Sequence, residues 1–298
     1  YERGYGMFEA WLAGQCAHGR RIYPRDECEL DDALADWTAF HMTNGKQRGQ
    51  LKNCRNARLY IIKWDPSMSL KYALTVMNGW DKRVPAKPTI PMPKGLMLLM
   101  VEWFLAENDP EMATIVSLSF ELMLRTQSEL LGLHVNDIRL PGTARSWTGS
   151  NFGTMHLRDT KTHDHDSVTL RPDLSTSLLK RWVMLQRQRG TQGKLFTFGA
   201  TTYRRRFLRC LKALGLPDDH PYSPYSLRHG GATHLHMSGT PIAEIASRGR
   251  WRRHNTCERY VSSGRALLGS ANLPENLKGL ARRLLDDPYQ LIRRYFGA

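Results

Sequence analysis

SLRHGGATH, residues 226–234, is the most informative stretch of the chain, and GRW at residues 249–251 follows it. Tyr260 stands nine positions after Trp251. A free phenol, with a pKa of ~10, is a poor nucleophile near neutral pH, so it needs cationic surroundings. The guanidinium of an arginine such as Arg228 holds phosphate oxygens with paired N–H donors, a task that a metal ion would otherwise perform. Together, these residue types suit a site in which guanidinium groups hold a phosphate and a phenol attacks it.

The same residues resemble the ending of the tyrosine recombinase, or phage integrase, family. That ending has a short helix with His-x-x-Arg, then Gly-His or Gly-Trp, and then a tyrosine nine residues on. The resemblance implies that Tyr260, in a Thr-x-x-x-Tyr segment, is the nucleophile that forms a 3′-phosphotyrosyl link with DNA. It also implies that Arg228 is the second catalytic arginine and that Trp251 packs beside the phosphate and donates its indole N–H. Taken singly, a tyrosine or a tryptophan more often packs in a core.

Arg125 is the candidate for the first catalytic arginine. It lies in LRTQSELLGL, residues 124–133, which resembles the family's Leu-Arg-x-x-Glu-Leu-x-x-Leu but has one extra residue between Arg125 and Glu129. In a regular helix, one extra residue would rotate a side chain by about 100°. A loop or bulge can absorb it, and we predict that it does so here. Glu129 then either orients Arg125 or merely begins a helix.

Two further positions complete the site that the resemblance implies. Tyr225 stands where the family has His or Lys, three residues before Arg228. Its hydroxyl can donate to a phosphate oxygen but cannot act as a base near neutral pH. We therefore expect activity to depend less on this position rather than to be lost. Lys161, in the polar turn DTKTHDHD at residues 159–166, resembles the lysine that protonates the leaving 5′ oxygen. The alternative is an ordinary solvent-exposed lysine. His163 and His165 have no spaced partner, so no metal site is predicted.

The net charge of +15 is the strongest global feature of the sequence. A protein this basic usually faces a polyanion, most often nucleic acid, although a basic surface can also serve solubility or meet anionic lipid. Basic residues cluster on predicted helices and near Tyr260, where they suit contact with the phosphate backbone of duplex DNA. For each one the alternative is a solvated surface charge. The candidates are Arg48, Lys52, Arg55, Arg204, Arg205, Arg206, Arg250, Arg252 and Arg253.

The five cysteines are widely spaced and form no Cys-x-x-Cys pair, so the sequence indicates neither a disulfide framework nor a zinc ribbon. A reducing, intracellular location in a nucleus or nucleoid is expected. The most apolar stretch, Gly95–Leu105, contains Glu102 and is too short to span a bilayer, so no membrane partner is predicted. Because the chain begins at Tyr1 rather than at a methionine, we expect it to be a fragment.

The pattern predicts a mainly α fold with a small antiparallel β-sheet. Residues 1–83 are expected to form a helical DNA-binding domain, and residues 84–93, with four prolines, an extended linker. A catalytic domain follows at 94–266, with strands at Thr154–Arg158 and Ser167–Leu170. The tail at 267–298 is amphipathic and is expected either to dock on a neighbouring protomer or to pack on its own chain. An interruption around Arg125 to Ser128 is expected in the helical segment Glu111–Leu133. The predicted helices are Leu30–Phe40, Gln47–Trp64, Gly95–Asn108, Glu111–Leu133, Leu174–Arg189, Thr201–Leu214, Ser226–Met237, Ile242–Arg248 and His254–Val261.

The resemblance implies an enzyme that cleaves and rejoins double-stranded DNA without metal, ATP or another cofactor. Recombination or integration, as of a mobile element, would require a homo-oligomer on DNA, from dimer to tetramer. Two alternatives stay open. A type IB topoisomerase-like enzyme shares the chemistry, and a DNA-binding relic would have lost activity through the changes at Arg125 or Tyr225.

Overall fold

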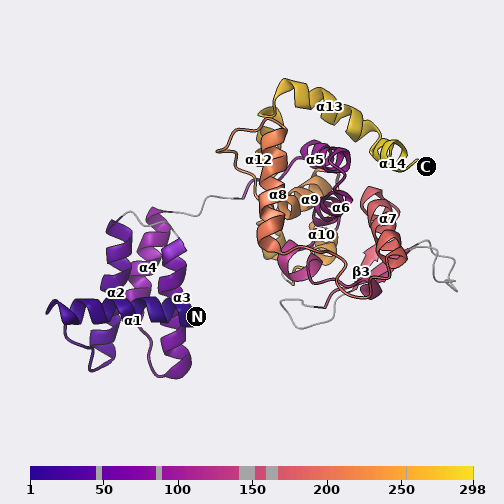
Figure 1. Cartoon of the computed structure of the whole chain (residues 1–298). Helices are drawn as coiled ribbons and strands as arrows, with labels where there is room; N and C mark the ends of the chain where they lie inside the picture. Colours follow the sequence, from indigo (N-terminus) through magenta and orange to yellow (C-terminus); the bar gives the residue numbers. More distant parts are fainter. Residues whose placement is uncertain (45–48, 85–88, 141–151, 159–166, 253, 298) are drawn as a thin grey trace. The chain divides into compact units, whose positions relative to one another are not determined.

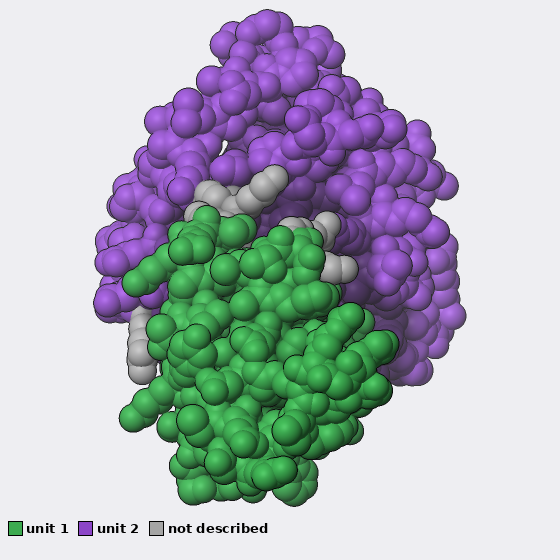
Figure 2. All heavy atoms as spheres, turned by 90° about the vertical axis from the view of Figure 1, so that its left-hand side faces the viewer, with its two compact units in different colours: residues 1–88 green, residues 89–298 purple. Residues whose placement is uncertain are grey.

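The computed structural model of the chain describes residues 1–44, 49–84, 89–140, 152–158, 167–252 and 254–297. The chain divides into two compact units, Tyr1–Pro88 and Thr89–Ala298 (Figure 2), and the division falls within the proline-rich segment. Each unit has a hydrophobic core of its own. The prediction of a mainly α fold with one small antiparallel sheet is confirmed. None of the described helices is long and apolar enough to cross a bilayer.

The first unit consists, in its described residues, of four helices. They are α1 (Glu2–Ala17), α2 (Glu27–Thr43), α3 (Gly49–Trp64) and α4 (Lys71–Arg83). The carboxylate of Asp26 accepts from the backbone N–H of Glu29, which satisfies a donor at the start of α2. Helix α1 packs on α3, and α2 packs on α4. Trp37 and Trp80 are fully buried between these helices and, because aromatic side chains bury large apolar areas, contribute strongly to this core.

The second unit is built around two buried helices, α5 (Lys94–Ala106) and α6 (Pro110–Glu121). Asp109 caps α6 by accepting from the N–H of Met112, with Pro110 at the first helical position. Around this pair lie α7 and α9 on α6 and α13 on α5 (Figure 1). The remaining helices are α7 (Leu174–Gln188), α8 (Ala200–Ala213), α9 (Tyr225–Met237), α10 (Ile242–Arg248), α11 (His254–Glu258), α12 (Ser263–Ala271), α13 (Glu275–Asp286) and α14 (Gln290–Phe296).

The sheet has three antiparallel strands in the order β1 (Ile138–Arg139), β2 (Gly153–His156) and β3 (Ser167–Leu170). Met155 pairs with Ile138 on one side and with Val168 on the other, and all three side chains are buried. The two predicted strands are therefore confirmed, although β2 ends two residues earlier than expected. Strand β1 was not predicted, because two residues are too few to show an alternating pattern.

Two glycines set the close approach of α9 to the core. A Cβ on Gly230 would lie 2.3 Å from the carbonyl oxygen of Met92, and one on Gly231 would lie 2.0 Å from that of Phe120. Backbone carbonyls cannot move away as a flexible side chain can, so only glycine fits at these positions. The Gly-Gly pair in the predicted motif therefore fixes the depth at which α9 carries Arg228.

The tail beyond residue 267 packs on its own chain. Leu277, Ala281 and Leu284 of α13 are buried in the same core as α5, and Leu291 and Ile292 of α14 join them. Of the two arrangements considered for the tail, docking on a neighbouring protomer and packing on its own chain, these contacts correspond to the second. The tail is thus part of the second unit rather than a segment outside the predicted catalytic domain.

Candidate active site

Arg228 lies inside the protein on α9, with only 1% of its side chain exposed. Its Nη1 donates to the carbonyl oxygen of Met123, and its Nη2 donates to that of Gly249 over 2.6 Å. Its guanidinium lies 4.5 Å from the centre of the Trp251 ring. Burial, followed by the charges of Arg125 and Arg250, lowers the pKa of Arg228 to about 10. The group is therefore still cationic at neutral pH and held in one orientation.

Arg125 lies where the predicted long helix is interrupted. Helix α6 ends at Glu121, and a π-helix, η1 (Thr126–Leu130), begins directly after Arg125. The N–H of Leu130 donates to the carbonyl of Arg125 over 3.2 Å, and that of Leu131 to the carbonyl of Thr126 over 2.9 Å. Both bonds span five residues instead of four, which is how a π-helix accommodates one extra residue. The extra residue between Arg125 and Glu129 is thus absorbed, as the sequence analysis predicted.

Glu129 connects three arginines through one buried carboxylate. Its oxygens lie 2.5 Å from Arg125 Nη1, 3.0 Å from Arg250 Nη2 and 3.8 Å from Arg228 Nη1. It also accepts from the backbone N–H of Arg125 over 2.7 Å. Burial alone would raise the pKa of this carboxyl, but Arg250, the Arg125 N–H and the other two guanidinium groups outweigh it and lower the pKa. Glu129 is therefore ionised and orients Arg125, the first of the two alternatives left open by the sequence.

Tyr260 lies in the turn after α11, with its hydroxyl against that of Tyr225. The two hydroxyls are hydrogen-bonded, and the rings meet edge to face at 5.8 Å. The Tyr260 ring stacks on His229 at 4.4 Å and lies 4.5 Å from the ring of Trp251. Its carbonyl accepts from the hydroxyl of Thr233 on α9 over 3.1 Å. Helix α9 therefore positions the tyrosine by both its ring and its backbone.

The surroundings of Tyr260 favour its ionised form. Burial would raise the pKa of this phenol, but the Tyr225 hydroxyl, the Trp251 indole N–H and the charges of Arg228 and Arg125 lower it below its ordinary value of 10.0. Burial and the hydrogen bond with Tyr260 raise the pKa of Tyr225. When Tyr260 ionises, Tyr225 is therefore the member of the pair that keeps its proton and donates to the phenolate.

A buried donor of Arg228 has no acceptor. Among the described residues, the Nε of Arg228 has no hydrogen-bond partner. Buried donors are nearly always paired, so this N–H indicates a place where an acceptor from a ligand fits. A pocket of about 550 Å³ opens between Arg125, Tyr225 and Arg228, with Arg204 on its wall. The arrangement can hold an anion with tetrahedral oxygens beside the hydroxyl of Tyr225, which is hydrogen-bonded to that of Tyr260.

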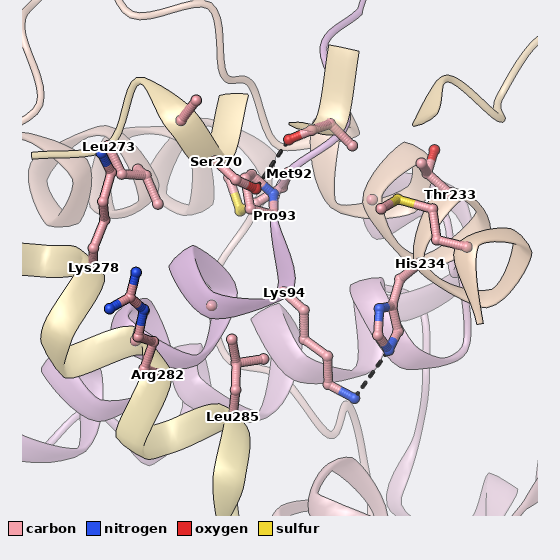
Figure 3. Close-up of a pocket in the computed structure, with 16 residues that line it drawn as sticks. Met92, Pro93, Lys94, Thr233, His234, Ser270, Leu273, Lys278, Arg282 and Leu285 are labelled. Atoms are coloured by element: carbon pink, nitrogen blue, oxygen red, sulfur yellow. Dashed lines mark hydrogen bonds between the residues drawn. The ribbon is translucent and has the colours of Figure 1, made fainter. Parts of the chain in front are cut away.

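A second pocket, of about 580 Å³, lies between α5, α9, α12 and α13 and is separate from these residues. Figure 3 shows Lys278 and Arg282 on one side of it and Thr233 and His234 on the other. Lys94 lies 3.4 Å from the Nε2 of His234. None of the residues predicted to be catalytic lines this pocket. Over the described ranges, no group of three or more His, Cys, Asp or Glu residues could hold a metal ion.

The predicted DNA-contacting residues have different environments. Lys52, Arg204, Arg205 and Arg252 are exposed, as backbone contact requires. Arg55 forms an ion pair with Asp81 over 2.8 Å, and Arg206 forms one with Asp109 over 3.0 Å. Lys161, Arg48 and Arg253 lie outside the described residues, as do His163 and His165.

Arg250 differs from the rest of that predicted set. Only 10% of its side chain is exposed, and its guanidinium binds Glu129 and main-chain carbonyls. The predicted contact with the DNA backbone therefore does not fit its inward orientation. Its sequence neighbours Gly249 and Trp251 gave no signal of this, because the direction of a side chain on a turn depends on tertiary contacts.

Comparison with known proteins identifies the family and similar folds. The family model described as "Phage integrase family" matches residues 99–266, which is more than half of the chain. No curated protein sequence matches. The fold is similar to that of the XerH site-specific recombinase bound to its difH substrate, with a TM-score of 0.58 and 16% identity over 91% of this chain and 78% of that one.

Two further solved structures have a similar fold. The Tn1549 transposon integrase in complex with transposon right end DNA has a TM-score of 0.52 and 15% identity, covering 80% of this chain and 84% of that one. A lambda integrase dimer bound to a COC′ core site has a TM-score of 0.52 and 13% identity, covering 78% and 64%. At these identities the likeness concerns the fold, and the family model is the finding that assigns the family. The chain belongs to the phage integrase family of tyrosine recombinases.

Proposed function

We propose that the chain is a site-specific DNA recombinase or integrase that cleaves and rejoins duplex DNA through Tyr260. The observation that carries the proposal is the position of Tyr260: its hydroxyl is hydrogen-bonded to that of Tyr225, and its ring centre lies 5.6 Å from the guanidinium of Arg228. Arg125 lowers the pKa of the same phenol. Two fixed cations beside a nucleophile of lowered pKa are what attack on a phosphodiester requires.

The proposed reaction has one nucleophile and one leaving group. The Tyr260 oxygen loses its proton to solvent and attacks phosphorus, the bond from phosphorus to the 5′ oxygen breaks, and a 3′-phosphotyrosyl ester forms. Arg125 and Arg228 hold the non-bridging oxygens, whose negative charge increases in the transition state. By the family resemblance, Lys161 gives the leaving 5′ oxygen its proton. The ester keeps the energy of the broken bond, so rejoining by a 5′ hydroxyl needs neither ATP nor a metal.

Tyr225 serves this reaction as a hydrogen-bond donor. Its raised pKa keeps it protonated, and its hydroxyl stabilises the phenolate of Tyr260 before attack. When a phosphate occupies the pocket, the same hydroxyl can donate to a phosphate oxygen instead. His229, whose pKa burial lowers to about 4, is neutral at pH 7 and packs against Tyr260 rather than acting as an acid.

Duplex DNA is the proposed partner. The exposed basic residues Lys52, Arg204, Arg205 and Arg252 support contact with phosphates, as does the net charge of +15. The similar XerH, Tn1549 and lambda proteins were all solved bound to DNA, and the lambda structure holds a dimer. We infer an assembly of protomers on DNA, from dimer to tetramer, and an intracellular location.

A covalent trapping assay tests the proposal. The probe is a pool of nicked duplexes of randomised sequence, in which the nick lets the cleaved end diffuse away and prevents rejoining. We expect an adduct that resists denaturation and maps to Tyr260, while Tyr260→Phe binds the pool without forming an adduct. If both proteins bind and neither forms an adduct, the inactive DNA-binding relic is the correct reading.

A second step separates the two active alternatives. Duplexes of two lengths that both contain the trapped sequence are incubated with the wild-type chain. A recombinase joins a strand of one duplex to the other and yields a product of intermediate length. An enzyme of the type IB topoisomerase kind reseals each duplex to itself and relaxes a supercoiled plasmid without exchange.

A further inference from the structure

Arg250 has a backbone conformation that arginine rarely adopts. Its φ is +58°, in the left-handed region where a Cβ is crowded and glycine is favoured. Such a conformation is strained for a residue with a Cβ and persists only where its surroundings compensate. The family pattern stated above has glycine directly before the His or Trp, whereas this chain has Gly249 and then Arg250 before Trp251. The arginine side chain must therefore supply contacts that offset the strain.

The contacts of Arg250 cross from its own turn to the segment that carries Arg125. Its Nη1 donates to the carbonyl of Arg248 over 2.9 Å, and its Nη2 lies 3.0 Å from Glu129 Oε2 and 3.3 Å from the carbonyl of Met123. Met123 itself has a φ of +50°. The Arg250 guanidinium thus joins its own turn to that of Met123, and both residues have a left-handed backbone conformation.

Arg250 and Arg228 bind the same two acceptors. Both donate to the carbonyl of Met123, and both lie near Oε2 of Glu129, Arg250 at 3.0 Å and Arg228 at 3.8 Å. The closer partner of that oxygen is therefore Arg250, although Arg228 is the arginine proposed to hold phosphate. With Arg250 present, one carboxylate is shared among three guanidinium groups, which leaves an excess of two positive charges.

Removal of Arg250 would change this balance. The cluster would keep one carboxylate and two guanidinium groups, an excess of one positive charge. Within this cluster, Glu129 would then pair with Arg125 and Arg228 alone. At short range in a buried site, an opposite charge holds an arginine strongly. The two arginines would then be partly neutralised by Glu129 when they are needed to neutralise a phosphate.

We propose that Arg250 is a positioning residue that occupies Glu129 and the Met123 carbonyl, and so keeps Arg125 and Arg228 directed at the scissile phosphate. The proposal rests on the proposed function of Tyr260. It replaces the expectation, drawn from the sequence, that Arg250 contacts the DNA backbone. Because Arg250 acts through Glu129, its effect belongs to the cleavage step and not to DNA binding.

The test compares Arg250→Gln and Arg250→Lys with Arg248→Gln as the matched control. The side chain of Arg248, two residues away, forms an ion pair with Glu244 on its own helix, and the variant keeps the main-chain carbonyl that accepts from Arg250. Three quantities are measured on the nicked-duplex pool: the rate of adduct formation at saturating protein, the dissociation constant, and the thermal midpoint. We expect Arg250→Gln to cleave roughly 10- to 100-fold more slowly with an unchanged dissociation constant, as loss of a charged hydrogen bond predicts.

The conservative variant and the control sharpen the result. Arg250→Lys keeps the charge but not the two-armed donor, so its cleavage rate should lie between those of Arg250→Gln and wild type. Arg248→Gln should cleave at the wild-type rate. If Arg250→Gln does not fold, the lysine variant alone decides, because a wild-type cleavage rate in a folded Arg250→Lys protein contradicts a need for the paired donors.

A double-mutant cycle with Glu129→Gln tests whether Arg250 acts through the carboxylate. When the charge of Glu129 is absent, loss of Arg250 should slow cleavage far less than it does in the wild-type background. An equal loss in both backgrounds overturns the proposal. Weaker DNA binding by Arg250→Gln with an unchanged cleavage rate overturns it as well and restores the backbone contact. If wild type forms no adduct, the proposed function itself has failed, which is a different outcome.

Discussion

The two arginines proposed to hold the phosphate reach the site by different structural means. Arg228 lies on a regular helix, α9, whose depth is set by Gly230 and Gly231 against Met92 and Phe120. Arg125 lies at a break between α6 and a π-helix and is held by Glu129. The regular element tolerates no change in spacing or size, whereas the irregular one has already absorbed an extra residue. The comparison shows that the same chemical role can rest on packing in one place and on a shared carboxylate in another.

The strongest test of the comparison is substitution of the buried arginine. Arg228→Lys loses the donors to the Met123 and Gly249 carbonyls and the two-armed grip on phosphate. We expect adduct formation to slow roughly 10²–10³-fold, as for loss of a preorganised donor. Chemical denaturation should show a loss of about 3 kcal/mol, because buried acceptors are left unpaired. A variant that retains half the wild-type rate would contradict a shared phosphate grip.

Gly231→Ala tests the packing side of the comparison. The new Cβ would lie 2.0 Å from the carbonyl oxygen of Phe120, which belongs to the central helix α6 and cannot yield. We expect a destabilisation of about 3 kcal/mol by urea unfolding, as for overpacking of a rigid core. Gly279→Ala is the matched control, because Gly279 lies within helix α13 and has nothing within 4 Å of an added Cβ. Equal losses in the two variants would mean that the contact with α6 is unimportant.

Tyr225→Phe sharpens the account of the nucleophile. Without the Tyr225 hydroxyl, one of the groups that lower the pKa of Tyr260 is removed, so that pKa rises. The phenolate is the attacking form, so the rise of cleavage rate with pH should move to higher pH, and the rate at pH 7 should fall about 10-fold. The remaining groups around Tyr260 are Arg125, Arg228, His229 and Trp251, which the variant leaves in place. A pH profile identical to that of wild type would refute the donor role.

The dependence of stability on pH distinguishes α9, which carries His229 and His234, from the π-helix, which carries Glu129. Burial lowers the pKa of His229 to about 4, and burial with the charge of Lys94 lowers that of His234 to about 4. An unfolded histidine titrates near ~6.5, so the unfolded chain binds more protons between these values, and stability falls as pH drops from ~6.5 to about 4. Because the pKa of Glu129 is lowered, its protonation reduces stability only when the pH falls below the ordinary pKa range of a carboxyl. Unfolding at pH 7, 5.5 and 4.5 checks this, and His234→Gln should flatten the upper part of the curve.

The smallest expected effect is deletion of Gln127. Its side chain is exposed within the π-helix, and its removal restores the shorter Arg-to-Glu spacing. If the extra residue is only absorbed, the variant should form an ordinary helical turn, lose less than about 1 kcal/mol of stability and cleave within a few-fold of wild type. A complete loss of adduct would show that the π-helix itself is required.

Much of the fold was predictable because its signals are local. Helices α2 and α3 of the first unit and α5 to α11 of the second follow from apolar spacing, and the two longer strands follow from alternation. Helices α1 and α4 were predicted only as part of a helical segment, residues 1–83. Strand β1 was not predicted because two residues are too few to show an alternating pattern of apolar and polar side chains. The tail was correctly read as amphipathic, but its partner, α5 of the same chain, lies far away in sequence. Periodicity predicts that a face is buried and does not say against what.

The sequence by itself determined which chemical groups are proposed for the site: Arg125, Arg228, Trp251 and Tyr260 stand at positions that resemble the family's pattern. Tertiary structure alone decided that Glu129 is shared by three arginines, that Tyr225 meets the nucleophile, and that Arg250 turns inward rather than toward solvent. The physical reason is that side-chain identity is written in the chain, whereas the direction of a guanidinium and the pKa of a phenol depend on charges and burial supplied by residues distant in sequence.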